Sequence, residues 1–442
     1  MNVAPTGLDT LTTLFLRPRT QERLAAFRDR RVRDLVGHAC RNVPYYERLF
    51  ADHGIRPEDI NGVRDLWKVP VTTRRTLQRL LPEEIVARGI DPDALIEAQS
   101  SGSTGRRLRV RRTWSEERVL RALRNRVGRR RGRRPWERGA RLEIPERLRP
   151  HDHRRPGVFL PRLGLYDDRS IDCLAEPASI IERLRALRPS VIGGFPPVLF
   201  RIARHAGDGG LADLGVRTIV VGGEVLTPAM RQRITAAFNA PVHENYGSIE
   251  FVQMAWQCPV GEEMHLCDDT MVLEVLRDGR PVAEGEVGEV VATGLHSYAM
   301  PLIRYQIGDL ATQGAPRCSC GAQVSTIRGV RGRMLDYFPL PGGRIVHPYE
   351  LTMPMMAAHA WIEQYQLTQE LVDRVVLRIV PGGQPSNVAM TQLRRQYAES
   401  LGAEVTFEVH LVDDLDLDAN GKCRVSRSLV RSPYDEPADE TP

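Results

Sequence analysis

Helix and strand patterns alternate along the middle of this chain, and that alternation constrains the fold more than any other feature. Residues 178–206 have the pattern of a helix, a short apolar strand at 190–194 and a second helix. Residues 216–224 form another buried-strand pattern that runs into a Gly-Gly turn. Residues 227–238 follow as a helix with proline in its first turn. Such alternation is typical of α/β architecture, in which helices cover the faces of a sheet.

Other parts of the chain carry different patterns. Residues 20–48 have helical periodicity, and residues 270–293 alternate like antiparallel strands separated by Asp278-Gly279 and Glu284-Gly285. After Asp336 the pattern changes to that of a small α+β unit, with a strand at 375–380, a helix at 391–401 and a strand at 404–412.

We therefore predict a mixed α/β and α+β fold in two domains. Residues 1–335 form a large N-terminal domain with β-sheets flanked by helices, and residues 336–431 form a small C-terminal α+β domain. Residues 432–442 are acidic and contain proline, which predicts a disordered tail.

Composition indicates the compartment. The chain has 442 residues, a net charge of +6 and seven cysteines. An odd cysteine count in a long chain whose first residues lack a secretory pattern predicts a reducing, cytoplasmic setting. The sequence contains no apolar run long enough for a transmembrane helix, so we expect no membrane association.

A loop rich in hydroxyl side chains and glycine interrupts two short strand patterns. Residues 99–107 read Gln-Ser-Ser-Gly-Ser-Thr-Gly-Arg-Arg. Glycines allow backbone N–H groups to point inward, and hydroxyls add further donors, which suits phosphate oxygens. The segment lacks the Walker pattern, and an ordinary flexible turn is the alternative interpretation. We favour phosphate binding, with Ser101, Ser103 and Thr104 as the donors.

Arginine is concentrated in residues 106–141, where sixteen occur. Apolar residues recur at near-helical spacing in the same stretch, which predicts an amphipathic helix with a solvated basic face. Binding of an anionic small molecule is the second interpretation, and nucleic acid is third because aromatic residues are sparse here. We therefore predict no nucleic-acid partner.

Lysine, by contrast, is almost absent. Of 62 basic side chains only Lys68 and Lys422 are lysines. Lys422 follows an Asn-Gly turn near the C-terminus. An ammonium is a compact point charge, whereas a guanidinium is a planar fork, so the two do not substitute for each other. Chance survival explains the rarity of lysine but not this location.

Four side chains could form a tetrahedral zinc site: Cys258, His265, Cys318 and Cys320. The Cys-Ser-Cys-Gly segment at 318–321 forms a tight turn that can present two thiolates. Buried free thiols are the alternative, and Cys267 could replace Cys258 or His265. Cys40, Cys173 and Cys423 are interpreted as packing residues.

Six motifs follow one another in the order of a known family. They are Ser-Ser-Gly-Ser-Thr-Gly at 100–105, Gly-Gly-Glu at 222–224, Tyr-Gly-Ser-Ile-Glu at 246–250, Arg-Tyr-Gln-Ile-Gly-Asp-Leu at 304–310, Gly-Arg-Met-Leu-Asp at 332–336 and Gly-Lys at 421–422. The chain resembles the adenylate-forming enzymes, which include acyl-CoA synthetases and adenylation domains. Asn-Val-Pro-Tyr-Tyr-Glu at 42–47 and the Cys-Ser-Cys-Gly segment are most similar to the phenylacetate–CoA ligase branch.

The resemblance implies ATP-dependent activation of a carboxylic acid through an acyl-adenylate, with release of pyrophosphate. Transfer of the acyl group to coenzyme A follows, on an aryl or small organic acid. It also implies a mobile C-terminal lid that hinges at Asp336. The alternatives are an amide- or ester-forming ligase that uses an amine or alcohol acceptor without coenzyme A, and a catalytically silent relative that acts as a binding protein. The resemblance leaves open whether two copies form a homodimer.

Roles for individual residues follow from the resemblance and from side-chain chemistry. Glu250 is expected to bind Mg²⁺, and Lys422 to meet the carboxylate and α-phosphate. The remaining ATP-binding candidates are Ser101, Ser103, Thr104, Gly223, Glu224, Tyr246, Asp309 and Arg333. Two positions depart from the family pattern. Arg106 stands where lysine is common, and Ile249 stands where many relatives have a hydroxyl residue.

Overall fold

A computed structural model describes residues 20–99, 108–143, 164–224, 226–333, 338–346, 351, 355, 361–415 and 425–430. The chain divides into two compact units. Unit 1 takes its described residues from 1–138, 149–168 and 243–330, and unit 2 takes them from 139–148, 169–242 and 331–442. The domain boundary at 335/336 that the sequence predicts remains a prediction.

Unit 1 begins with helices. Thr20 caps α2 (Gln21–Asn42) by accepting a hydrogen bond from the Arg23 N–H. The expected helix over 20–48 is interrupted at Val43, which is extended, and restarts as α3 (Pro44–Asp52). Proline explains the break, because it disfavours helical geometry in the residue before it and suits the first position of a helix. Shorter helical elements follow: η1 (Pro57–Asp59), η2 (Val63–Lys68), α4 (Arg74–Arg79), α5 (Pro82–Ile85) and η3 (Pro92–Ala94).

The strands of unit 1 lie in the order β11-β10-β12-β13-β14-β9-β8-β7. Their bounds are β7 (Val242–Tyr246), β8 (Ala255–Gln257), β9 (Met264–Leu266), β10 (Met271–Arg277), β11 (Arg280–Pro281), β12 (Val287–Gly294), β13 (Tyr305–Gln313) and β14 (Thr326–Arg333). β10 pairs with β11 and β12 in antiparallel register. Asp278 and Gly279 form the two-residue turn between β10 and β11, both with positive φ, as a type I′ hairpin requires. Antiparallel pairing over 270–293 is thereby confirmed.

A separate hairpin and a long helix complete unit 1. β1 (Ile96–Gln99) pairs antiparallel with β2 (Arg109–Arg112), so the hydroxyl-rich loop does lie between two strands. α6 (Trp114–Arg130) follows at once. Its capping box links Thr113 and Glu116: the Thr113 side chain accepts from the Glu116 N–H, and Glu116 accepts from the Thr113 N–H. The helix buries Val119, Leu120, Leu123 and Val127, which confirms the predicted amphipathic pattern.

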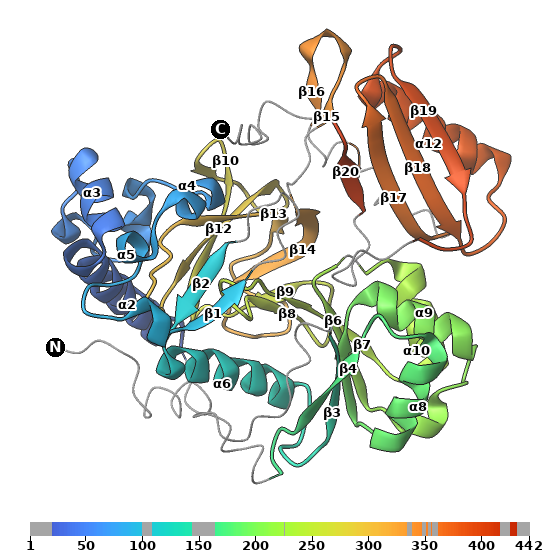
Figure 1. Cartoon of the computed structure of the whole chain (residues 1–442), viewed down its shortest axis with the longest axis horizontal. Helices are drawn as coiled ribbons and strands as arrows, with labels where there is room; N and C mark the ends of the chain where they lie inside the picture. Colours follow the sequence, from blue (N-terminus) through green and yellow to red (C-terminus); the bar gives the residue numbers. More distant parts are fainter. Residues whose placement is uncertain are drawn as a thin grey trace. The chain divides into compact units, whose positions relative to one another are not determined.

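Unit 2 contains the α/β part of the chain. Its strands lie in the order β6-β5-β3-β4, where β3 is Gly139–Glu143, β4 is Asp168–Asp172, β5 is Val191–Gly194 and β6 is Thr218–Gly222. β5 pairs with β3 and with β6 in parallel register. α8 (Pro177–Leu187), α9 (Pro196–Ala206) and α10 (Pro228–Phe238) flank these strands in Figure 1, and η5 (Ala212–Leu214) precedes β6. The helix–strand alternation predicted from the sequence is therefore present.

The C-terminal part of unit 2 is a small α+β arrangement. Its strands lie in the order β19-β18-β17-β20, with β17 (Ile362–Leu371), β18 (Arg374–Pro381), β19 (Thr406–Leu411) and β20 (Ser426–Ser428). β15 (Phe338–Pro339) and β16 (Ile345–Val346) flank η6 (Pro341–Gly343) as a short separate hairpin. α12 (Asn387–Leu401) begins four residues before the predicted helix because Ser386 caps it. Leu393 and Tyr397 of α12 pack in one core with Leu367 and Leu377.

None of the helices in the described part of the chain has the length and apolar character that crossing a membrane requires.

Candidate active site

Tyr246 and Asp309 meet in the interior of unit 1. Tyr246 is the last residue of β7, and Asp309 lies in β13. The Tyr246 hydroxyl donates a 2.8 Å hydrogen bond to Asp309 Oδ2, and both side chains are buried. A phenol that donates to a carboxylate fixes the orientation of that carboxylate.

The backbone of β13 is irregular at Asp309. Opposite β12, the register shifts between Glu289 and Val291, so that the β13 segment around 307–309 bulges. Gly308 has φ of 86°, a left-handed conformation that glycine adopts without steric cost. Bulges redirect side chains at functional sites, and this one determines where Asp309 points.

Glu250 lies on the tight turn that follows β7. Only 3% of its surface is exposed, and its Oε1 accepts a hydrogen bond of 3.1 Å from the Tyr305 hydroxyl. The turn is closed by a hydrogen bond of 2.7 Å from the Val252 N–H to the Ser248 carbonyl. Gly247 is needed here, because an added Cβ would lie 2.1 Å from the Val252 carbonyl oxygen. The β7 turn and β13 are thus joined at two points, once through Asp309 and once through Glu250.

Arg112 also contacts the turn that carries Glu250, and the sequence did not lead us to predict this contact. Arg112 ends β2, it is buried, and its Nη2 donates to the backbone carbonyls of Ile249 and Glu250, the latter over 2.9 Å. Burial lowers the pKa of the Arg112 guanidinium, and the nearby carboxylates of Glu117 and Glu250 act in the opposite direction. The sequence did carry a signal: Arg112 is two residues after the inward-facing Val110, so strand alternation directs it inward as well.

Further arginines of the 106–141 stretch are also turned inward. Arg126 makes two hydrogen bonds to Asp269, of 2.5 and 2.8 Å, and Arg133 pairs with Asp168. Arg121, Arg129, Arg130, Arg134 and Arg138 are exposed. The predicted solvated basic face is therefore only partly right, since several guanidinium groups stabilise the interior of unit 1 instead.

Several predicted site residues lie outside the described residues or outside unit 1. Ser101, Ser103, Thr104, Lys422 and the predicted hinge Asp336 are not among the described residues. The backbone of Arg333 ends β14. Gly223 and Glu224 follow β6 in unit 2, where Gly223 has φ of 81°. What the structure brings together is therefore Tyr246, Glu250 and Asp309, with Tyr305 and Arg112 around them.

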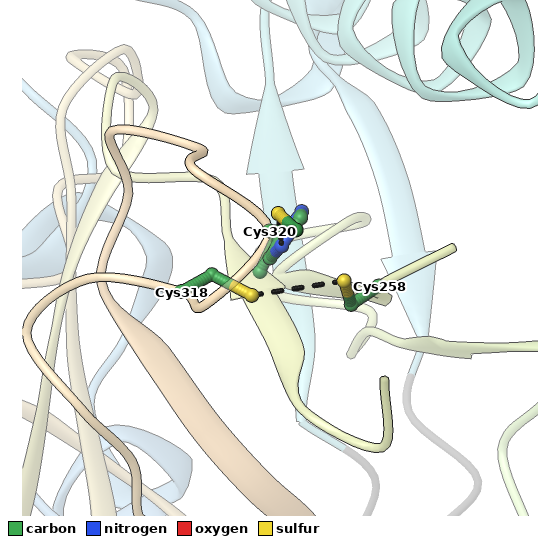
Figure 2. Close-up of side chains that lie close together, drawn as sticks. Cys258, Cys318 and Cys320 are labelled. Carbon is green, nitrogen blue, oxygen red and sulfur yellow. Dashed lines mark hydrogen bonds between the residues drawn. The ribbon is translucent and has the colours of Figure 1, made fainter. Parts of the chain in front are cut away.

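The predicted metal ligands converge at another point of unit 1. The ligand atoms of Cys258, His265, Cys318 and Cys320 all lie within 4.8 Å of one another. Cys318 Sγ is 3.6 Å from Cys258 Sγ, the contact dashed in Figure 2, and Cys320 Sγ is 3.3 Å from His265 Nε2. A disulfide requires about 2.05 Å between its sulfurs, whereas two thiolates on one tetrahedral zinc ion lie about 3.8 Å apart.

Strand pairing explains why residues so distant in sequence meet. Cys258 follows β8, His265 lies in β9, and Cys318 and Cys320 lie in the loop that leads to β14. β9 is hydrogen-bonded to both β8 and β14, with His265 opposite Trp256 and Thr326. The loop before β14 consequently faces the β8–β9 hairpin.

Cys267 is not part of this cluster. It lies in a separate apolar cluster with Leu123, Val127 and Trp256, which decides the alternative that the spacing left open. Cys173 is buried in the core of unit 2, and Cys40 packs against the core of unit 1, as expected for packing residues. Cys423 lies outside the described residues.

Comparisons with known proteins agree with this architecture. A phenylacetate-coenzyme A ligase of Thermus thermophilus is 28% identical over 361 residues, which cover 78% of each chain. A phenylacetate-coenzyme A ligase of Escherichia coli is 27% identical over 330 residues, which cover 70% of each chain. The crystal structure of a 2-hydroxyisobutyryl-CoA ligase with 2-HIB-AMP superposes with a TM-score of 0.72 at 18% identity, covering 97% of this chain and 94% of that one. Residues 340–428 match the family model of the CapK C-terminal domain.

The fold, the motif order and these relatives define the class: the chain is an AMP-forming carboxylate ligase of the adenylate-forming superfamily. Within that superfamily, the relatives that match its sequence include these phenylacetate-coenzyme A ligases and a CapK protein of Staphylococcus aureus, which is 24% identical over 255 residues.

Proposed function

We propose that this protein activates an aryl or small organic acid with ATP and Mg²⁺, forms an acyl-adenylate and transfers the acyl group to coenzyme A. The observation that carries the proposal is the pair of buried hydrogen bonds, Tyr246 to Asp309 and Tyr305 to Glu250, which hold two carboxylates between the β7 turn and β13. Buried carboxylates held by neutral donors are unusual in a purely structural core, and metal or ligand binding gives them a use.

Glu250 fits the role of magnesium ligand. Its Oε1 accepts from Tyr305, and Mg²⁺ in nucleotide enzymes is typically held by one or two carboxylates together with phosphate oxygens. Mg²⁺ would neutralise charge on the phosphate oxygens when bound. The part of this chain is to hold the carboxylate in one orientation, which Tyr305 and the tight turn at 247–252 do.

Asp309 fits the role of ribose acceptor. An ionised carboxylate accepts hydrogen bonds only, as the two hydroxyls of a ribose require. Tyr246 fixes the orientation of Asp309 through its hydroxyl, and the ring of Tyr246 would stack on adenine. Ser101, Ser103 and Thr104 would bind phosphate oxygens, Gly223 and Glu224 would line the nucleotide site, and Arg333 would donate to the ribose.

Lys422 would carry the charge that the chemical step needs. Negative charge builds up where the carboxylate attacks the α-phosphate, and a point charge placed there stabilises the transition state. Coenzyme A is the proposed acceptor because the relatives reported above are named as coenzyme A ligases.

We further propose that Cys258, His265, Cys318 and Cys320 bind one structural zinc ion. The donor set of three sulfurs and one imidazole is a common closed zinc set, and the spacing of 3.6 Å between two sulfurs is close to that of a tetrahedral site. Zinc would tie the loop before β14 to the β8–β9 hairpin.

The test of the function is acid-dependent exchange of labelled pyrophosphate into ATP, run with a panel of aryl and small aliphatic acids. Product analysis with coenzyme A, an amine or an alcohol as the only acceptor then identifies the second step. Glu289→Gln is the matched control for Glu250→Gln, since Glu289 is a half-buried carboxylate that accepts a 2.6 Å hydrogen bond from Gln306. Exchange by wild type and by Glu289→Gln, but not by Glu250→Gln, supports the proposal. A thioester product found only with coenzyme A supports the acceptor.

A further inference from the structure

The turn that carries Glu250 is held by the side chain of Arg112, which lies outside the six motifs. Arg112 Nη2 donates to the carbonyl oxygens of both Ile249 and Glu250. These are consecutive peptide units, so one guanidinium nitrogen fixes the two carbonyls that flank the Glu250 Cα atom. Rotation of the peptide planes around Glu250 would break at least one of the two bonds.

Arg112 is itself held in place. Its Nη1 lies 3.7 Å from Glu117 Oε2, and Glu117 also accepts a 2.9 Å hydrogen bond from Arg121. Arg112 belongs to β2, which is paired with β1 from Ile96 to Gln99. A planar guanidinium anchored at one side by a carboxylate and at the other by two carbonyls has little freedom to move.

Glu116, in the first turn of α6, makes further hydrogen bonds where β2 leads into α6. Its Oε2 accepts from the Thr113 N–H over 2.7 Å, and its Oε1 accepts from the N–H groups of Tyr298 and Ala299, the latter over 2.9 Å. The junction of β2 and α6 therefore binds two separate loops of unit 1 by buried polar contacts. Of these two loops, the one held by Arg112 carries the proposed magnesium ligand.

We propose that Arg112 is a positioning residue for the adenylation step: it fixes the backbone of Glu250 so that the carboxylate meets Mg²⁺ in one orientation. Arg112 needs no contact with the substrate for this role. It acts through Glu250, while Tyr305 holds the same side chain at its carboxylate end. The inference rests on the proposed function, because it assigns Arg112 a role through the magnesium ligand.

The role predicts a specific kinetic effect. Arg112→Met keeps much of the side-chain volume and removes every donor, so the Glu250 turn loses both carbonyl contacts. Misplacing a catalytic group by about 1 Å can lower a rate by up to roughly 100-fold. We expect pyrophosphate exchange to fall about 10- to 100-fold, and the Mg²⁺ concentration for half-maximal rate to rise. Arg112→Lys should lie between wild type and Arg112→Met.

Two further readouts separate positioning from general stability. Arg112→Ala leaves space for a guanidinium ion, so millimolar guanidinium chloride should restore part of the exchange activity, whereas urea at the same concentration should not. Arg133→Ala is the matched control: Arg133 is another arginine of unit 1 whose side chain is only 9% exposed, and it pairs with Asp168 and donates to the Glu137 carbonyl. It should lower thermal stability without changing the Mg²⁺ requirement.

Amide hydrogen exchange decides the inference independently of activity. In Arg112→Met, residues 248–253 should exchange faster than in wild type, while Arg133→Ala should leave that segment unchanged. If wild type shows no acid-dependent exchange of pyrophosphate, the proposed function fails, and faster amide exchange at 248–253 still supports the positioning of this turn by Arg112. Unchanged amide exchange at 248–253, or an unchanged Mg²⁺ requirement in a fully active Arg112→Met, overturns the inference.

Discussion

The hydroxyl of Tyr305 donates a 3.1 Å hydrogen bond to Glu250 Oε1, and both side chains are buried. Tyr305 begins β13, the strand that also carries Asp309. The metal-binding and ribose-binding roles proposed for the two carboxylates therefore depend on one strand. A substitution of Tyr305 should first disturb the orientation of the Glu250 carboxylate.

Tyr305→Phe tests that dependence. Removing the hydroxyl leaves a buried carboxylate oxygen without this donor, which typically costs about 1–3 kcal/mol. We expect a lower free energy of unfolding in urea titrations and a higher Mg²⁺ requirement for pyrophosphate exchange. A variant with wild-type Mg²⁺ dependence would show that the hydrogen bond does not orient the metal ligand.

Asp309→Asn tests the ribose contact. The amide keeps the shape of the side chain, and its oxygen can still accept from Tyr246, so stability should change by less than about 1 kcal/mol. The amide loses the charge and half of the acceptor capacity, so ATP affinity measured by calorimetry should fall about tenfold. Glu289→Gln serves as the control, because it also replaces a carboxylate with an amide. Equal ATP affinity in wild type, Asp309→Asn and Glu289→Gln would show that Asp309 does not belong to the nucleotide site.

Cys318→Ser tests the zinc proposal. Protein purified without chelator should contain about one zinc per chain by elemental analysis, and Cys318→Ser should lose zinc and melt at lower temperature, because metal binding is coupled to folding. Cys267→Ser is the matched control, since Cys267 is a buried cysteine of the same unit outside the cluster. A metal-free wild type that is fully stable would contradict the proposal, as would equal zinc loss in Cys267→Ser.

Lys422→Ala should separate the two half-reactions. Adenylate formation should fall about 10²–10³-fold, the typical effect of removing one preorganised transition-state donor, while transfer from a chemically made acyl-adenylate should continue. Lys422→Arg should also be poor, because the planar fork cannot replace a point charge. Lys68→Ala is the control, as Lys68 pairs with Asp65 over 2.9 Å in unit 1. Adenylate formation by Lys422→Ala at the wild-type rate would refute the role.

Local patterns predicted the elements well where capping and turn residues are explicit. Asp278-Gly279 and the Thr227-Pro228 start of α10 are examples, and both are found as expected. The break at Val43 was missed because apolar periodicity continues across it, while the effect of Pro44 on its neighbour is a local steric one. The early start of α12 depends on the Ser386 cap, which lies outside the periodic segment.

The site was predicted in part, for a physical reason. Motif order selected Tyr246, Glu250 and Asp309 as candidates, and side-chain hydrogen bonds between the β7 turn and β13 bring them together as long-range contacts. Arg112 was hidden among sixteen arginines, because composition cannot tell a buried guanidinium from a solvated one. Its partners are backbone carbonyls. Every residue has such a carbonyl, so the sequence does not show which of them an arginine binds. The convergence of the four cysteine and histidine side chains was predicted, since cysteine and histidine are rare enough for their spacing to be informative, and metal binding by them stays a prediction.

Activation of a carboxylic acid by this protein is tested most directly by exchange of labelled pyrophosphate into ATP, compared between wild type and Glu250→Gln at saturating acid and Mg²⁺. The substitution removes the charge of the proposed metal ligand while keeping its shape and its place in the turn. We expect acid-dependent exchange by wild type and severely weakened exchange by Glu250→Gln. Full exchange by Glu250→Gln would contradict the role of Glu250, and absence of acid-dependent exchange in wild type across the panel would contradict the proposed activation of these acids.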